Sequence, residues 1–149
     1  MTQNAMSEKM IVKRSISPVA VGTTGASNGS TGKIIDRRGY KGVEFIVSFG
    51  TVTATNATYT LILKEGDVTG TMTSIADGDL IGTEAGACIG ATATRTSGTS
   101  KNVTKRVGYK GLKRYVQAAK LYSTVTATTP IGVDVLLYDP EQSPTSPTQ

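Results

Sequence analysis

The sequence predicts an all-β protein, a β-sandwich or jelly roll folded as a single domain of 149 residues. Three observations predict this class. Thr, Ser, Gly and Val dominate the chain, and β-branched residues suit pleated strands whereas Gly and Ser mark turns. Apolar residues alternate with polar ones over short runs, and no long run has helical periodicity. A chain of this length can bury enough surface to fold without disulfides or a metal.

The strand candidates follow one another with turns between them. Residues 1–16 are expected to form a first strand or a docking arm, because the apolar patch Met10-Ile11-Val12 is flanked by basic residues. Residues 17–140 are expected to form the sandwich, with alternating strands over 43–49, 58–64 and 133–137. The Gly-rich loop 22–32 and the tail 141–149 can bury almost nothing, so we expect both to be flexible or disordered.

Residues 112–122 are ambiguous, because their apolar positions also fit one side of a helix. An internal repeat favours a strand. Gly-Tyr-Lys-Gly at residues 39–42 returns at 108–111, and each copy precedes a long strand candidate, a Thr-Val-Thr-Ala-Thr string and an apolar strand. The repeat suggests two related hairpin halves packed face to face. A chance match between short Gly/Thr-rich strings is the alternative.

Reactive chemistry finds little support in the sequence. Histidine is absent, which excludes Ser-His-Asp and Cys-His sites, and the single Cys88 lies in an apolar setting typical of a core residue. The Gly-rich string before Ile34 departs from phosphate-loop spacing. Asp77-Gly78-Asp79 with Glu84 does not match a calcium-binding loop and is equally typical of a turn. We therefore expect no catalytic residue, cofactor or metal, and no enzyme activity.

The charges are divided along the chain. Residues 65–84 carry five acids and no base, whereas residues 85–133 carry eight bases and no acid. This division favours complementary surfaces between copies of the chain or toward an acidic partner. Tyr109, Tyr115 and Tyr122 lie within the basic stretch, as in nucleic-acid-binding surfaces, but we expect them to pack in a turn and within the sheet. Nucleic acid is thus the less favoured partner, and no apolar run suggests a membrane.

Four segments resemble small structural proteins of tailed phages. They are Arg37-Arg-Gly-Tyr-Lys-Gly-Val-Glu-Phe-Ile-Val47, Tyr59-Thr-Leu-Ile-Leu63, Ala76-Asp-Gly-Asp-Leu-Ile-Gly-Thr-Glu84 and Val107-Gly-Tyr-Lys-Gly-Leu-Lys-Arg-Tyr-Val116. The resemblance spans residues 34–138 and is to capsid decoration, or cement, proteins. It implies a homo-oligomer, a dimer or trimer, that binds the major capsid protein on the outer capsid surface and stabilises the shell by bridging capsomers. The expected location is the virion, and the host cytoplasm during assembly.

Contact residues follow from this reading. We expect capsid contacts at apolar and basic positions of the arm and the basic loops, namely Met10, Ile11, Val12, Lys13, Arg14, Arg37, Arg38, Lys105 and Arg106. We expect oligomer contacts between acidic and basic positions, namely Asp77, Asp79 and Glu84 against Lys110, Lys113 and Arg114. One alternative is a phage tail or head-completion protein stacked in rings. Another is a carbohydrate- or nucleic-acid-binding β module, although a chain without Trp lacks the usual sugar-binding platform.

Overall fold

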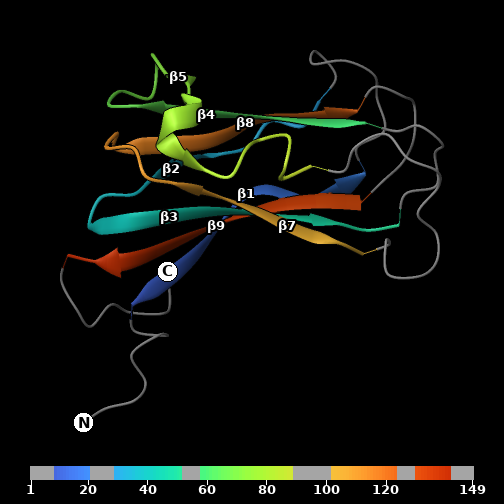
Figure 1. Ribbon diagram of the computed structural model, residues 1–149, viewed down its shortest axis with the longest axis horizontal. Coiled ribbons are helices and arrows are strands. Elements are labelled where there is room, and N and C mark those ends of the chain that lie inside the picture. The colour runs from blue at the N-terminus through green and yellow to red at the C-terminus, as the bar shows by residue number, and fades with distance from the viewer. Residues whose placement is uncertain (1–8, 21–28, 52–57, 89–101, 124–129, 142–149) are drawn as a thin grey trace, which may run out of the picture.

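The computed structural model describes residues 9–20, 29–51, 58–88, 102–123 and 130–141. These residues form two antiparallel β-sheets that lie one above the other (Figure 1). The only helical element among them is one 3-10 turn, η2 (Asp77–Asp79), and none of them forms a helix that could cross a membrane. The prediction of an all-β sandwich is confirmed.

Nine strands make up the described part of the two sheets. Sheet A contains, in spatial order, β1 (Met10–Ala20), β9 (Pro130–Pro140), β3 (Tyr40–Phe49), β7 (Thr104–Tyr109) and β6 (Leu80–Ile81). Sheet B contains β2 (Ile34–Asp36), β8 (Tyr115–Ser123), β4 (Tyr59–Gly66) and β5 (Thr73–Ser74). The ambiguous segment 112–122 is thus a strand from Tyr115 onward, as the repeat predicts.

The core lies between the sheets and is built by the alternation seen in the sequence. In β3 the four residues of the predicted stripe are all buried, and β4 and β9 bury alternate residues in the same way. The largest fully buried side chains come from both sheets and include Phe45, Leu63, Leu121, Ile131 and Leu137. A bulge in β8 places Ala118 opposite Leu63 and Lys120 opposite Ile62, which leaves Ala119 without a partner. The parts of β8 before and after the bulge therefore both direct alternate residues into the core.

The N-terminal segment is a strand of the sheet. β1 pairs with β9 from Met10 opposite Tyr138 to Ala20 opposite Pro130, so the expected boundary between an arm ending at residue 16 and the sandwich falls inside a strand. The expectation of a flexible loop is wrong for residues 29–32, because Ser30 pairs with Leu121. Residues 1–8, 21–28 and 142–149 lie outside the described residues.

The two repeat halves do not form hairpins. Within the described strands, the first strand of each half pairs with the second strand of the other: β3 with β9 in sheet A, and β8 with β4 in sheet B. The strands that precede the two halves are crossed in the same way. β2, which precedes β3, pairs with β8, and β7, which precedes β8, pairs with β3. The prediction of two hairpins is therefore wrong in its pairing. A tight hairpin turn has about 2–5 residues, whereas the connections after β3 and β8 are long enough to cross between sheets.

The two Gly-Tyr-Lys-Gly strings also occupy different structural positions. The first begins β3, and Gly39 before it has a φ of +87°, which only glycine adopts without strain. The second ends β7, where Tyr109 is buried, and is followed by a turn in which Leu112 is 92% exposed. The two strings thus lie at the same end of the sandwich, but their corresponding residues do not occupy equivalent positions.

Candidate interaction surface

The outward side of sheet A carries apolar side chains across its whole width. The register places Met10, Tyr138 and Gly42 in one row, and Val12, Leu136 and Glu44 in the next. A third row contains Arg14, Asp134, Ile46 and Arg106. We call this outward surface the sheet A face; its members are Met10, Val12, Arg14, Glu44, Ile46, Ile81, Arg106, Asp134, Leu136 and Tyr138. Val12 is 57% exposed and Ile81 is 59% exposed.

Two glycines inside the strands make room for large side chains on this face. A Cβ atom at Gly42 would lie 2.2 Å from the ring of Tyr138, so the ring lies directly over the glycine. A Cβ atom at Gly108 would lie 3.1 Å from Cβ of Ile81. Glycine in a strand interior costs stability unless close approach needs it. Here it lets an aromatic and an aliphatic side chain lie against the backbone of the sheet.

The charges of the sheet A face are paired. Arg106 donates a hydrogen bond of 2.8 Å to Glu44, and Arg14 lies 3.8 Å from Asp134. Exposed pairs of this kind contribute about 0–1 kcal/mol to stability. Their consequence here is that the face has apolar side chains between balanced charges and no net charge. Such a composition, with apolar side chains among paired charges, resembles a protein-binding surface more than a surface for a highly charged ligand.

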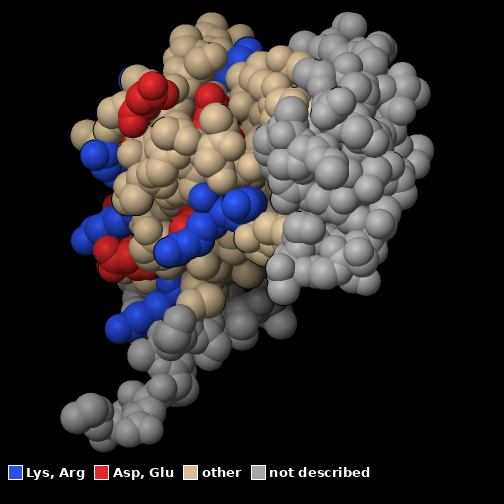
Figure 2. Space-filling view, turned by 45° about the vertical axis from the view of Figure 1, so that its right-hand side comes forward, with Lys and Arg blue, Asp and Glu red and all other residues tan. Residues whose placement is uncertain are grey.

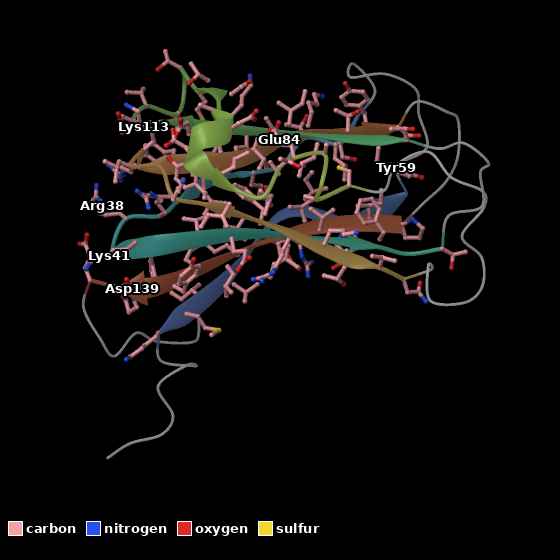
Figure 3. The ribbon with its side chains drawn as sticks, viewed as in Figure 1. Arg38, Lys41, Tyr59, Glu84, Lys113 and Asp139 are labelled. Atoms are coloured by element: carbon pink, nitrogen blue, oxygen red, sulfur yellow. The ribbon has the colours of Figure 1, made fainter. Side chains whose placement is uncertain are left out.

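The structure brings together four of the expected capsid-contact residues. Met10, Val12, Arg14 and Arg106 all lie on the sheet A face. Ile11 is 3% exposed and points into the core, and the two lysines fall on the inward-facing register of their strands, where they are half-buried: Lys13 and Lys105. Arg38 lies in the turn before β3 at one end of the sandwich (Figure 3).

Arg37 is a correction to the expected contacts, because it is 9% exposed and bonded within the chain. Its Nε donates to the carbonyl of Lys113 at 2.6 Å, and its two terminal nitrogens donate to the carbonyls of Lys41 and Gly111 at 3.0 Å each. The guanidinium also lies 5.4 Å from the ring centroid of Tyr109. A rigid fork of donors suits such a site. Arg37 thus ties the two Gly-Tyr-Lys-Gly strings together and is not a surface contact.

Tyr109 extends this buried polar cluster. Its hydroxyl donates to the carboxylate of Glu65, which is 9% exposed, and accepts a hydrogen bond of 3.0 Å from the backbone N–H of Lys113. Burial raises the pKa of Tyr109 above its ordinary value, and the bond to Glu65 raises it further. Among the described residues no buried side-chain nitrogen or oxygen lacks a partner. The cluster is therefore fully satisfied, which marks it as structural.

Two of the expected oligomer-contact bases already have acidic partners within the chain. Lys113 Nζ lies 2.6 Å from Asp67, and Arg114 binds both carboxylate oxygens of Asp36, at 2.7–3.2 Å. The guanidinium of Arg114 lowers the pKa of Asp36. Figure 2 shows basic and acidic side chains interspersed at this end of the molecule. The remaining base, Lys110, has an exposed side chain.

The expected acidic contacts lie beside β4 and β7. Asp77 and Asp79 are in the η2 turn, and the carbonyl of Asp79 accepts a hydrogen bond of 2.9 Å from the backbone N–H of Lys110. Glu84 points back onto β4, where its carboxylate accepts a hydrogen bond of 2.5 Å from Leu63. Burial raises the pKa of Glu84. Glu84 is thus a cap on the edge of β4.

The outward side of sheet B differs in charge and in aromatic content. Tyr115, Gln117, Lys120 and Tyr122 point outward from β8, and Thr60, Ile62 and Lys64 point outward from β4. Tyr115 and Tyr122 are half-buried and belong to β8. The bulge at Ala119 keeps both tyrosines on the outward side although they are seven positions apart. We call this surface the sheet B face.

Open pockets at the surface are lined by described residues. One open pocket of about 270 Å³ is lined by Arg37, Arg38, Gly39, Tyr40, Arg114 and Glu141. Another of about 360 Å³ lies between the ends of β1, β3 and β9 and is mostly apolar. No group of three or more acidic or cysteine side chains able to hold a metal is found in the described part of the chain. Both pockets are surface depressions and offer no converging reactive groups.

Sequence reasoning missed six of the ten members of the sheet A face. It identified the four on β1 and β7 but not Glu44, Ile46, Ile81, Asp134, Leu136 and Tyr138. A signal was present, because β3 and β9 each carry an apolar residue at an outward position between two inward ones, as in Phe45-Ile46-Val47. A half-buried strand alternates apolar with polar residues. Apolar residues on both sides of a strand are typical of strands that are covered on both faces.

No protein-family model matches the sequence, and no curated protein is similar to it.

Proposed function

We propose that this protein is a non-enzymatic virion structural protein, a decoration or cement protein that binds the outer surface of a tailed-phage capsid through its sheet A face. The observation that carries the proposal is the exposure of Val12 and Ile81 on a neutral, mostly apolar sheet surface. Exposed apolar patches on otherwise polar proteins mark interaction sites. The resemblance of residues 34–138 to phage structural proteins supports the major capsid protein as the partner.

The mechanism is linkage between binding and shell stability. A protein that binds the assembled shell and not its dissociated subunits stabilises the shell by RT ln(1 + [L]/Kd), about 2.7 kcal/mol at a concentration of 100 Kd. A broad sheet surface with paired charges suits this task, because a wide contact distributes the binding free energy over many atoms. An interface of standard size buries about 800 Å² on each partner.

The test replaces exposed apolar residues on the face by a charge. The double variant Val12→Asp/Ile81→Asp should keep its fold, because both side chains are more than half exposed. We expect it to lose at least about tenfold in affinity for empty capsids that lack the protein, measured by co-sedimentation, because each buried carboxylate lacks a partner. Expanded and unexpanded shells are tested in parallel.

Leu112→Asp is the matched control, since Leu112 is 92% exposed and lies in the turn before β8, away from this face. It should bind capsids like the unaltered protein. Equal binding by the double variant and the unaltered protein would refute the assignment of the sheet A face. Equal loss in the Leu112 variant would show that any added negative charge weakens binding, and would refute it as well.

A further inference from the structure

The sheet B face presents tyrosines and lysines on the same side of one sheet. Along β8 the outward order is Tyr115, Gln117, Lys120 and Tyr122. The register places Lys64 of β4 beside Gln117, and Thr60 beside Tyr122. With a rise of about 3.3 Å per residue, the two tyrosines lie roughly 20 Å apart along the strand. Both lysines fall between them.

The charge of this face is unbalanced, in contrast to the sheet A face. The one carboxylate on its described outward positions is Asp36, and Arg114 binds it at 2.7 Å. Lys64 forms no ion pair with a described residue, and Lys120 donates only a long hydrogen bond of 3.3 Å to the carbonyl of Gly29. The face therefore carries uncompensated positive charge and favours an anionic partner.

The tyrosines indicate which class of anionic partner fits this face. Arg114 lies 4.7 Å from the ring centroid of Tyr115 and is itself held by Asp36, so this ring and guanidinium are fixed in place. Single-stranded nucleic acids bind to sheets through bases that stack on aromatic rings and guanidinium planes, while lysines neutralise their phosphates. Bases of a duplex are stacked on one another and cannot do so. An acidic protein surface would use the lysines but would not need the rings.

We propose that the sheet B face binds single-stranded nucleic acid, with Tyr115 and Tyr122 stacking on bases and Lys64 and Lys120 contacting phosphates. Side chains on this side of the molecule project away from sheet A, so the two faces are separate (Figure 3). The inference does not depend on the proposed capsid binding.

The test is fluorescence anisotropy of the full chain with fluorescein-labelled oligo(dT) of about 15 nucleotides, within the usual range of single-stranded sites. We expect Lys64→Gln/Lys120→Gln to weaken binding and to reduce the slope of log K against log salt by about 1.4, because each phosphate contact contributes about 0.7. Tyr115→Thr/Tyr122→Thr should weaken binding at least about thirtyfold and leave that slope unchanged. Threonine suits a strand and keeps the fold.

Arg14→Gln/Arg106→Gln is the charge-matched control, because it removes the same number of positive charges from the sheet A face. It should bind oligo(dT) like the unaltered protein. Absence of binding at low salt, or equal weakening by the control, would overturn the proposal. So would equal affinity for a duplex of the same length, or undiminished binding by the tyrosine variant, which would indicate an acidic protein or another polyanion. Each result leaves the capsid test with Val12 and Ile81 unaffected.

Discussion

At the scale of single residues, one buried arginine joins the two repeated strings. Arg37 donates to the carbonyl of Lys41 at the start of β3 and to two carbonyls in the connection between β7 and β8, and its guanidinium lies near the ring of Tyr109. The Tyr109 hydroxyl accepts a further backbone N–H of that connection. Arg37 is the side chain that joins the two segments to each other.

Replacing this arginine should destabilise the fold. Arg37→Ala removes three charge-assisted hydrogen bonds from a buried site, and we expect the free energy of unfolding in urea to fall by about 3 kcal/mol. The free energy of unfolding of Arg37→Lys should lie between those of the unaltered protein and Arg37→Ala, because an ammonium group cannot bind three carbonyls as the planar guanidinium does. The neighbouring exposed Arg38→Ala is the control and should change stability by less than about 0.5 kcal/mol. A change as small in Arg37→Ala would contradict this role.

Cys88 provides a second test at this scale. It is 7% exposed, and burial raises the pKa of its thiol to about 12 from an ordinary 9.0, with repulsion from Glu84 adding to the rise. Three pKa units lower the thiolate fraction at neutral pH about a thousandfold, and the thiolate is the reactive form. We expect a disulfide reagent to label Cys88 only as the protein unfolds, with urea dependence that matches unfolding followed by circular dichroism. Rapid labelling of the native protein would contradict its burial.

At the scale of elements, side chains close the edges that strands leave open. The free edge of β4 beyond β5 is capped by Glu84, which accepts the N–H of Leu63, and the carbonyl of Leu63 accepts the N–H of Ile75. Open strand edges invite pairing with other chains. At the short strand β2, the pair Asp36–Arg114 holds the turn before β8 against the sheet.

The Asp36–Arg114 pair predicts a pH dependence. Its hydrogen bond lowers the pKa of Asp36 below the ordinary 3.8, so the folded protein binds this proton less readily than the unfolded chain. The pair therefore adds stability above pH 3.8, and this stability is lost as the pH falls through the lowered pKa. We expect Asp36→Asn to be less stable at neutral pH and to lose less stability on acidification than the unaltered protein, measured by urea unfolding at several pH values. Asp79→Asn should follow the unaltered protein; parallel curves for all three would refute the pair's contribution.

At the scale of the whole molecule, the two halves of the chain interlock. Every described strand pair except β4 with β5 joins one strand before residue 88 to one after residue 102. Sheets with such distant pairings fold slowly, because long loops must close before contacts form. The interlocking also makes each sheet a product of both halves.

Fragments should therefore not fold separately. When the chain is divided between residues 95 and 96, we expect each fragment alone to give the narrow amide dispersion of an unfolded chain in NMR spectra. Mixing them should restore dispersed signals, because the missing partner strands are then supplied. A dispersed spectrum from either fragment alone would show that its half is independently stable and would contradict the crossed pairing.

The sequence by itself predicted much of this fold. The inward side of β3 is specified by its apolar stripe, Val43, Phe45, Val47 and Phe49, whatever strand lies beside it. Side chains of a strand alternate between its two sides, so these four residues can only be buried together. The missing histidine removed whole classes of chemistry. The repeat correctly predicted a strand in place of a helix after Leu112. Of the expected contacts, the outward residues of β1 and β7 lie together on one face.

Tertiary structure alone decided which strands are neighbours and which charged residues are free. The alternation of apolar and polar residues is the same whether strands pair within a half or between halves. The sequence pattern therefore cannot distinguish hairpins from the crossed arrangement. Arg37 and Arg38 are adjacent and identical in type, yet one is enclosed by three carbonyls and the other is exposed. Burial of a charge depends on acceptors more than 70 residues away in the chain. Local sequence specifies which side chains of a strand point inward, and long-range packing decides which strands and charged groups pair.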